Sequence, residues 1–150
     1  MSSTKEVFVI DTSVAIKWFL KEPYESEALK LKNAFKNGLC RLLTTDLIYP
    51  EFANTIWKRV IFYDLEPEDG VLMINAFRTI PLEVISSKEL LAKAFTIATQ
   101  YKRSVYDALF LALSVENTCN LVTADEKFYN ALRNSFPKLL WIGNTVFPVK

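Results

Sequence analysis

The first regular element of the chain is Glu6-Val7-Phe8-Val9-Ile10-Asp11, and this stretch decides the fold class. The residues before the aspartate are mostly apolar and β-branched, which is typical of a buried parallel strand. Thr12 to Leu20 then repeats apolar residues at helical spacing, so we expect the strand to lead directly into a helix. Asp11 would therefore lie at the carboxyl end of a strand, where parallel sheets place their ligand crevice.

Outward from this strand, strand patterns alternate with helical patterns. Further strands are expected at Leu42–Thr44, Leu82–Ile85, Asn120–Thr123 and Leu139–Ile142. Further helices are expected at Tyr24–Lys36, about Asp46–Tyr63, Glu66 to about Arg78, Ser86 or Ser87 to about Tyr101, from Ser104, and Asp125 to about Arg133. Such alternation predicts a parallel sheet covered by helices on both faces. No internal repeat or linker interrupts it, so residues 1–150 are expected to form one α/β domain.

The composition excludes several kinds of active site. The 150 residues include no histidine, which removes His-based acid–base catalysis, Ser-His-Asp and Cys-His systems, and imidazole-bound zinc. Cys40 and Cys119 are far apart in sequence, so each is expected to be a small buried apolar residue. A hydrolase working at neutral pH would then depend on carboxylates and a hard, oxygen-binding cation.

The charge balance and the hydropathy bear on possible partners and on cellular location. Eighteen Lys and Arg offset 17 Asp and Glu, for a formal charge of +1. This lacks the strongly basic signature of a nucleic-acid binder but does not exclude one, because an acidic pocket can cancel a basic rim. The first ten residues lack the apolar core of a signal peptide, and no apolar run has the length of a membrane span. We therefore expect a cytoplasmic protein without a membrane partner.

Four acidic residues occupy positions that a parallel sheet would bring to one edge. Asp11 ends the first strand, and Asp125 lies two residues after Leu121-Val122-Thr123. Glu51 and Asp107 lie in the first turns of predicted helices. Each acid also has a purely structural explanation. Asp11 and Asp125 are good N-cap residues, Ser104-x-x-Asp107 fits a capping box, and Glu51 suits a helix N-terminus.

Capping alone explains each acid taken singly, but it explains the four acids less well as a group. Asp107 precedes the apolar run Ala108–Leu113, which predicts a helix buried nearly all round, and a buried carboxylate needs a partner. No Lys or Arg lies within one turn downstream, so a divalent cation is an economical partner. Converging carboxylates favour Mg²⁺ or Mn²⁺, which activate a bound water and stabilise in-line attack on a phosphodiester. The pattern indicates a nuclease site.

These residues also carry a family resemblance. The relevant stretches are Val9-Ile10-Asp11-Thr12-Ser13, Glu51-x-x-Asn54, Tyr106-Asp107-Ala108-Leu109 and Leu121-Val122-Thr123-Ala124-Asp125. In order, spacing and total length they resemble the signatures of PIN-domain ribonucleases. Within that family the chain is most similar to the VapC toxins of prokaryotic toxin–antitoxin pairs.

The resemblance implies a three-layer α/β/α fold with a central parallel sheet of four to five strands. It implies an endoribonuclease in which Asp11, Glu51, Asp107 and Asp125 bind Mg²⁺ or Mn²⁺ and hydrolyse RNA. It also implies an inhibitory cognate antitoxin and a homodimer. Supporting roles are implied for Ser13, Asn54 and Thr123. Many relatives carry a further acid shortly after the last Asp, and here only Glu126 could serve.

Two alternatives stay open. A degenerate PIN domain would act only as a binding or regulatory module, but it would be expected to lack one or more of the four acids. Another Mg²⁺-dependent α/β hydrolase, such as a phosphatase with an Asp nucleophile, usually has a second Asp two residues after the first, where this chain has Ser13. The three glycines form no P-loop motif.

Basic and aromatic residues outside these motifs have two interpretations each. Lys58-Arg59 and Lys102-Arg103 are either contacts for an RNA backbone or ordinary solvated helix ends. Trp18, Phe19 and Trp57 either stack on bases or bury an antitoxin segment, or else belong to the core or a dimer interface.

Overall fold

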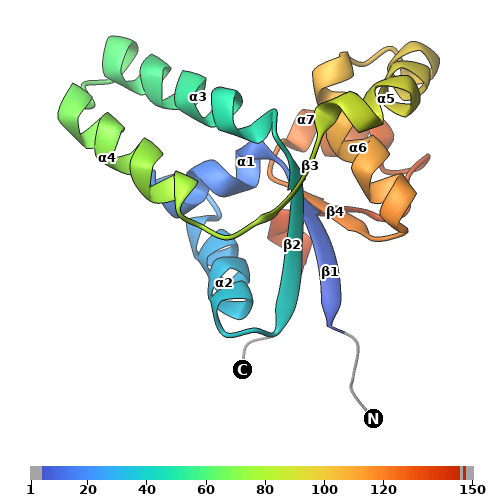
Figure 1. Ribbon diagram of the computed structural model, residues 1–150, viewed down its shortest axis with the longest axis horizontal. Coiled ribbons are helices and arrows are strands. Elements are labelled where there is room, and N and C mark those ends of the chain that lie inside the picture. Colours follow the sequence, from blue (N-terminus) through green and yellow to red (C-terminus); the bar gives the residue numbers. More distant parts are fainter. Residues whose placement is uncertain (1–4, 146, 148–150) are drawn as a thin grey trace.

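The computed structural model describes residues 5–145 and 147. Its centre is a five-stranded sheet in which every neighbouring pair is parallel, in the order β3-β2-β1-β4-β5 (Figure 1). The strands are β1 (Glu6–Ile10), β2 (Cys40–Thr45), β3 (Glu83–Ile85), β4 (Asn120–Thr123) and β5 (Leu139–Trp141). The predicted α/β class with a central parallel sheet is confirmed, and each predicted strand is present.

Helices connect the strands and cover the sheet. They are α1 (Thr12–Ala15), α2 (Glu25–Lys36), α3 (Ile48–Phe62), α4 (Pro67–Arg78), α5 (Ser87–Tyr101), α6 (Val105–Asn117) and α7 (Glu126–Leu132), with short 3₁₀ turns η1 (Ile16–Trp18) and η2 (Ile142–Asn144). Figure 1 shows α3 and α4 together on one side of the strands' carboxyl ends, and α5 and α6 together on the other. The two helix pairs therefore flank the edge at which a ligand crevice is expected.

The helix predicted from Thr12 to Leu20 is shorter in the structure. The α-helix α1 ends at Ala15 and continues as the 3₁₀ turn η1. Tertiary contacts account for the difference, because the indole Nε1 of Trp18 donates a hydrogen bond to the Ala28 carbonyl oxygen of α2 at 2.9 Å. Trp18 is thus a buried core residue, one of the two roles left open for it.

The core surrounds β1 and α6. Phe8, Val9 and Ile10 of β1 are buried, and β1 is bordered by β2 on one side and β4 on the other. Seven consecutive residues of α6, from Ala108 to Ser114, are buried, as the apolar run predicted. Cys40 and Cys119 are buried free thiols, also as expected. Within the described residues, no helix is long and apolar enough to cross a membrane.

The N-terminus of α5 is held by a residue from another part of the chain. Ser86 occupies the N-cap position but makes no capping hydrogen bond with its side chain. Instead, the carboxylate of Asp46, in the loop after β2, accepts hydrogen bonds from the Ser87 backbone nitrogen at 2.6 Å and from Ser87 Oγ at 3.3 Å. Asp46 therefore connects the loop that leads into α3 with the start of α5.

Aromatic packing holds α4 against α3. Phe77 of α4 is 1% exposed, and its ring stacks on Phe52 of α3 with 4.2 Å between centroids. The ring of Phe19 meets both at steep angles. Phe19 is therefore part of the packing between η1 and the two helices.

Replacing Phe77 with Ala should lower the free energy of unfolding by about 3–5 kcal/mol, because the change leaves a cavity between α3 and α4. Urea unfolding followed by circular dichroism would measure this. Leu72→Ala on the same helix is the matched control, since Leu72 is 67% exposed and its loss should change stability by less than about 0.5 kcal/mol. Equal effects of the two substitutions would contradict the packing described here.

Candidate active site

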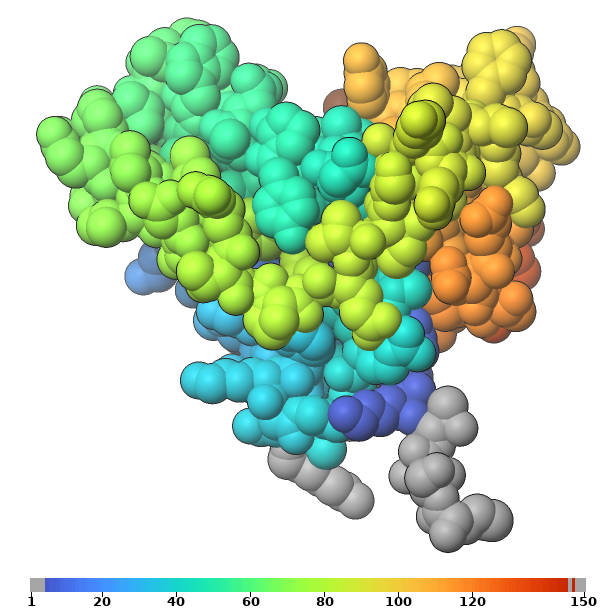
Figure 2. All heavy atoms as spheres, viewed as in Figure 1, coloured from blue at the N-terminus to red at the C-terminus, as the bar shows by residue number. Residues whose placement is uncertain are grey.

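A cleft of about 590 Å³ lies at the carboxyl edge of the sheet, and all four predicted acids line it. They come from four different places: Asp11 follows β1, Glu51 is in α3, Asp107 is in α6 and Asp125 precedes α7. Figure 2 shows the surface notched between the α3–α4 side and the α5–α6 side. The other lining residues are Thr12, Ser13, Ile16, Lys17, Glu22, Leu47, Pro50, Asn54, Thr55, Lys58, Tyr106, Phe110, Ala124 and Phe128.

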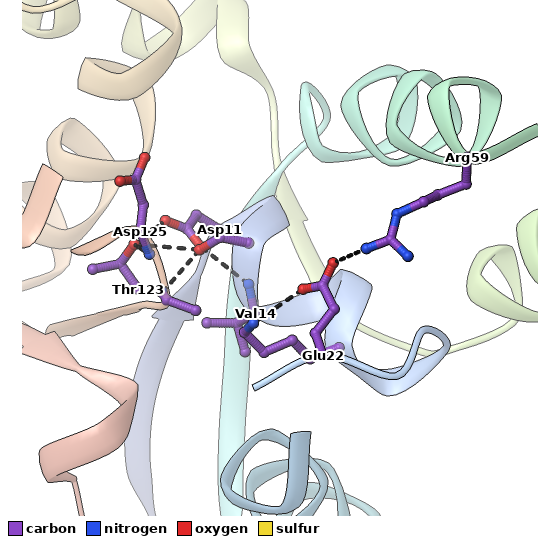
Figure 3. A network of polar contacts seen from close by, with 9 residues as sticks. Asp11, Val14, Glu22, Arg59, Thr123 and Asp125 are labelled. Atoms are coloured by element: carbon purple, nitrogen blue, oxygen red, sulfur yellow. Dashed lines mark hydrogen bonds and ion pairs between the residues drawn. The ribbon is translucent and has the colours of Figure 1, made fainter. Parts of the chain in front are cut away.

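Asp11 is the most deeply buried of the four acids. It is 8% exposed, and both of its carboxylate oxygens are hydrogen bonded. Oδ1 accepts from Ser13 Oγ at 2.5 Å and from the Val14 backbone nitrogen at 3.3 Å, which also makes Asp11 the N-cap of α1. Oδ2 accepts from Thr123 Oγ1 at 2.6 Å (Figure 3). These bonds fix the direction of the carboxylate.

Ser13 and Thr123 also connect Asp11 to the β4–α7 junction. Ser13 Oγ accepts a hydrogen bond from the backbone nitrogen of Ala124 at 2.8 Å. Thr123 Oγ1 accepts one from the backbone nitrogen of Asp125 at 3.1 Å. The structure thus brings together two hydroxyl residues that are 110 positions apart in sequence, each hydrogen bonded to the Asp11 carboxylate. The resemblance implied only that both support the site, and that role stays a prediction.

Glu51 lies in the first turn of α3 and is partly buried. Its Oε1 accepts a hydrogen bond from Thr12 Oγ1 at 2.7 Å, which joins α3 to the residue directly after Asp11. Thr12 was quoted within the first sequence motif, but nothing in its spacing showed that it would contact Glu51. Asn54, one turn further along α3, is exposed and lines the same cleft.

Asp107 pairs with a basic residue that precedes it, whereas only the residues after it were expected to matter. Its Oδ2 accepts a hydrogen bond from an Nη of Arg103 at 3.3 Å, one helical turn upstream rather than downstream. The guanidinium of Arg103 also lies over the ring of Phe128, 5.5 Å from its centroid. Ser104 Oγ caps α6 by accepting from the Asp107 backbone nitrogen, so the capping interpretation of Ser104 was also right.

Asp125 and Glu126 differ in their position. Asp125 caps α7 by accepting from the Phe128 backbone nitrogen at 3.1 Å, and it also lines the cleft. Glu126 lies in the first turn of α7, where it is exposed and does not line the cleft. Its supporting role stays a prediction.

The surroundings disfavour the charged forms of Asp11, Glu51 and Asp107. The pKa of Asp11 is raised from 3.8 to about 6, chiefly by burial and to a smaller extent by the charge of Asp125, while its hydrogen bonds act in the opposite direction. Burial also raises the pKa of Glu51, with a contribution from the charge of Asp107. Burial likewise raises the pKa of Asp107, where the charge of Arg103 acts in the opposite direction. Several carboxylates with raised pKa values in one cleft favour the interpretation of the cleft as a functional site.

The donor chemistry of the site fits a hard divalent cation. All four acids offer oxygen ligands, and the repulsion between their charges is what a bound cation would relieve. In the part of the chain that the structure describes, no three acidic side chains are arranged closely enough to enclose a metal ion as they stand. Metal binding at this site therefore requires carboxylates to turn toward a common point.

Three charged residues at the cleft were not predicted as a group. The carboxylate of Glu22 accepts from Lys17 Nζ at 3.0 Å and from an Nη of Arg59 (Figure 3). Lys17 and Glu22 line the cleft, and Arg59 was considered only as half of a basic pair. A lysine on the predicted helix directly after Asp11 was the available signal, because its side chain had to reach solvent or a carboxylate.

A family model for the PIN domain matches residues 8–133 of this chain. The chain is also similar to a ribonuclease of Pyrobaculum aerophilum, Ribonuclease VapC3. The two are 28% identical over 134 residues, which cover 88% of this chain and 96% of the relative.

Solved structures share the fold. The crystal structure of PAE2754 from Pyrobaculum aerophilum matches with a TM-score of 0.64 at 16% identity, covering 84% of this chain and 79% of that one. The VapBC2 complex of Rickettsia felis, solved with a DNA fragment from its promoter, matches with a TM-score of 0.60 at 17% identity. That match covers 90% of this chain and 96% of the other.

Replacing Asp11 with Asn should change how folding stability depends on pH. The folded-state pKa of Asp11 lies above that of the unfolded chain, so the folded protein binds this proton more tightly. The stability from the protonated form is complete below about pH 4 and is lost as the pH rises through about 6.

From about pH 4 to about pH 8, the free energy of unfolding of Asp11→Asn relative to the parent should therefore rise, by up to about 3 kcal/mol. Urea unfolding in EDTA at a series of pH values would measure the difference. Glu116→Gln, at an exposed position of α6, is the control and should show no such trend. A pH-independent difference for Asp11→Asn would contradict the burial of this charge.

Proposed function

The chain belongs to the PIN-domain family, and from that premise we propose that it is a metal-dependent endoribonuclease of the VapC type. The observation that carries the proposal is the convergence of Asp11, Glu51, Asp107 and Asp125 on one cleft. A catalytically degenerate module would be expected to have lost part of this set. The name of the Pyrobaculum aerophilum relative, a ribonuclease, supports RNA as the substrate.

In this proposal Asp11, Glu51, Asp107 and Asp125 hold Mg²⁺ or Mn²⁺. When bound, the cation supplies charge stabilisation to the phosphodiester and a bound water of lowered pKa. Because the chain has no histidine, the proposed site relies on its carboxylates and a hard cation. Burial disfavours the charged forms of Asp11, Glu51 and Asp107, and a bound cation would favour those charged forms by offsetting their negative charge.

The neighbouring polar residues position the acids. Ser13 and Thr123 donate to opposite oxygens of Asp11, which leaves its carboxylate one orientation. Thr12 donates to one oxygen of Glu51 and Arg103 donates to one oxygen of Asp107, so these two carboxylates are held less completely than Asp11. Polar residues around metal-binding carboxylates typically orient them for binding. We assign Ser13, Thr123 and Asn54 to supporting roles, with Glu126 as a secondary candidate at the rim.

We also propose an antitoxin partner and a homodimer. Large apolar side chains are exposed along α3 and α4, namely Trp57, Ile61, Phe62, Val71 and Leu72. A second exposed group, Leu91, Phe95 and Tyr106, lies on the α5–α6 side. Exposed apolar groups of this size mark protein interaction surfaces. A similar fold occurs in the VapBC2 complex, which supports an antitoxin as one of the partners.

Cleavage of a mixed pool of structured and single-stranded RNA tests the proposed activity. The purified protein should cleave RNA with Mg²⁺ or Mn²⁺ and lose cleavage in EDTA. Asp11→Asn and Asp107→Asn should each reduce the rate by at least about 100-fold, because loss of even an outer partner costs a metal site about 10–100-fold.

Glu116→Gln is the matched control for this experiment, because Glu116 is an exposed acid on the same helix as Asp107 and does not line the cleft. Circular dichroism would show that each variant is folded. Cleavage that survives in both aspartate variants would rule out the acidic site. No cleavage by the folded parent protein with either metal would favour the binding module.

A further inference from the structure

The α3 side of the cleft has charged residues that make no hydrogen bond or ion pair with the four acids in the described part of the structure. We call Lys17, Glu22, Lys58 and Arg59 the basic end of the cleft. Lys17, Glu22 and Lys58 line the same cleft as the acids, and Arg59 pairs with Glu22. In Figure 3, Glu22 and Arg59 lie toward α3, away from Asp11 and Asp125.

Lys17 is held in place by Glu22. Lys17 is 8% exposed, and its Nζ lies 3.0 Å from Glu22 Oε1. The other oxygen of Glu22 accepts from Arg59, so one carboxylate serves two cations. A buried ammonium without a counter-charge would be costly. Glu22 and Arg59 therefore support Lys17, and three basic residues against one acid leave the basic end positively charged.

The helix α3 joins the acids to the basic end. Glu51, Asn54, Thr55 and Lys58 all line the cleft, and their spacing of three, four and seven residues places them on one face of the helix. Lys58 lies about 10 Å along the helix axis from Glu51, at 1.5 Å per residue. A polyanionic chain bound at the acids can therefore continue along α3 toward an exposed lysine.

We propose that Lys17 and Lys58 form a subsite for a backbone phosphate of RNA, next to the phosphodiester that is cleaved. This inference rests on the proposed function, because it takes RNA as the substrate. Lysine binds phosphate as a point charge, and phosphate contacts dominate the affinity of proteins for nucleic acids. Glu22 and Arg59 are positioning residues, since they act through Lys17.

The structure separates the members of the two basic pairs. In Lys58-Arg59, the arginine is paired with Glu22 and the lysine faces the cleft. In Lys102-Arg103, the arginine is paired with Asp107, and Lys102 is exposed but does not line the cleft. Lys102 is thus a matched control for Lys58, because both are exposed lysines next to an ion-paired arginine.

The test measures binding of a labelled, unstructured single-stranded RNA by fluorescence anisotropy across a series of KCl concentrations, at a fixed Mg²⁺ concentration. The full chain carries Asp11→Asn to prevent cleavage. Lys58→Ala should weaken binding and lower the slope of log affinity against log salt by about 0.7, the contribution of one phosphate contact on a single strand. Lys17→Gln should do the same, with thermal unfolding to confirm that it folds, and Lys102→Ala should leave the slope unchanged.

Cleavage by the parent protein, measured in parallel, separates the two hypotheses. Reduced slopes for Lys58→Ala without any cleavage by the parent would support the subsite and remove the proposed function. Cleavage by the parent with an unchanged slope for Lys58→Ala would overturn the subsite and keep the nuclease. An equal change for Lys102→Ala would also overturn it, because binding would then have no preference for the α3 side.

Discussion

The carboxylate of Asp11 is a charge buried at the carboxyl end of the central strand, and much of the surrounding structure serves to hold it. Removing a carboxylate from water is costly unless hydrogen bonds compensate. Here the compensation comes from Ser13, Val14 and Thr123, two of them adjacent in sequence and one on the neighbouring strand β4. The raised pKa of Asp11 shows that this compensation is incomplete. A cation bound beside Asp11 would therefore stabilise its charged form.

A residue that caps a helix in this fold can also line the cleft. Asp11 and Asp125 each accept a hydrogen bond from the backbone of the helix that follows, and both also line the cleft. A helix N-terminus stabilises negative charge, so capping favours the ionised form of each carboxylate, which is the form that the proposed metal site would use. Asp11 and Asp125 are therefore N-cap residues as expected, and this leaves their proposed role in metal binding open.

The cleft has two chemically different ends, and the helix α3 belongs to both. Its first turn contributes Glu51 to the acidic end, and its third turn contributes Lys58 to the basic end. Because α3 also packs on α4 through Phe52 and Phe77, the position of Glu51 depends on aromatic packing that starts at the next residue of the helix. The connection to α5 through Asp46 fixes the base of the same helix.

The order of the elements, their types and the gathering of four acids at one cleft were predictable, because each depends on local sequence patterns and on the geometry of a parallel sheet. Strand and helix patterns have different periods, and the end of a parallel strand is a known site for ligands. Only the tertiary structure decided which side chains meet. The bonds of Thr12 to Glu51, Thr123 to Asp11 and Arg59 to Glu22 depend on how segments far apart in sequence pack together, and periodicity carries no information on that. The pairing of Asp107 with Arg103 is different, because the two residues are four positions apart and their contact is local. The replacement of a regular helix by η1 has the tertiary cause, since the bond from Trp18 to α2 selects among conformations that the local sequence leaves open.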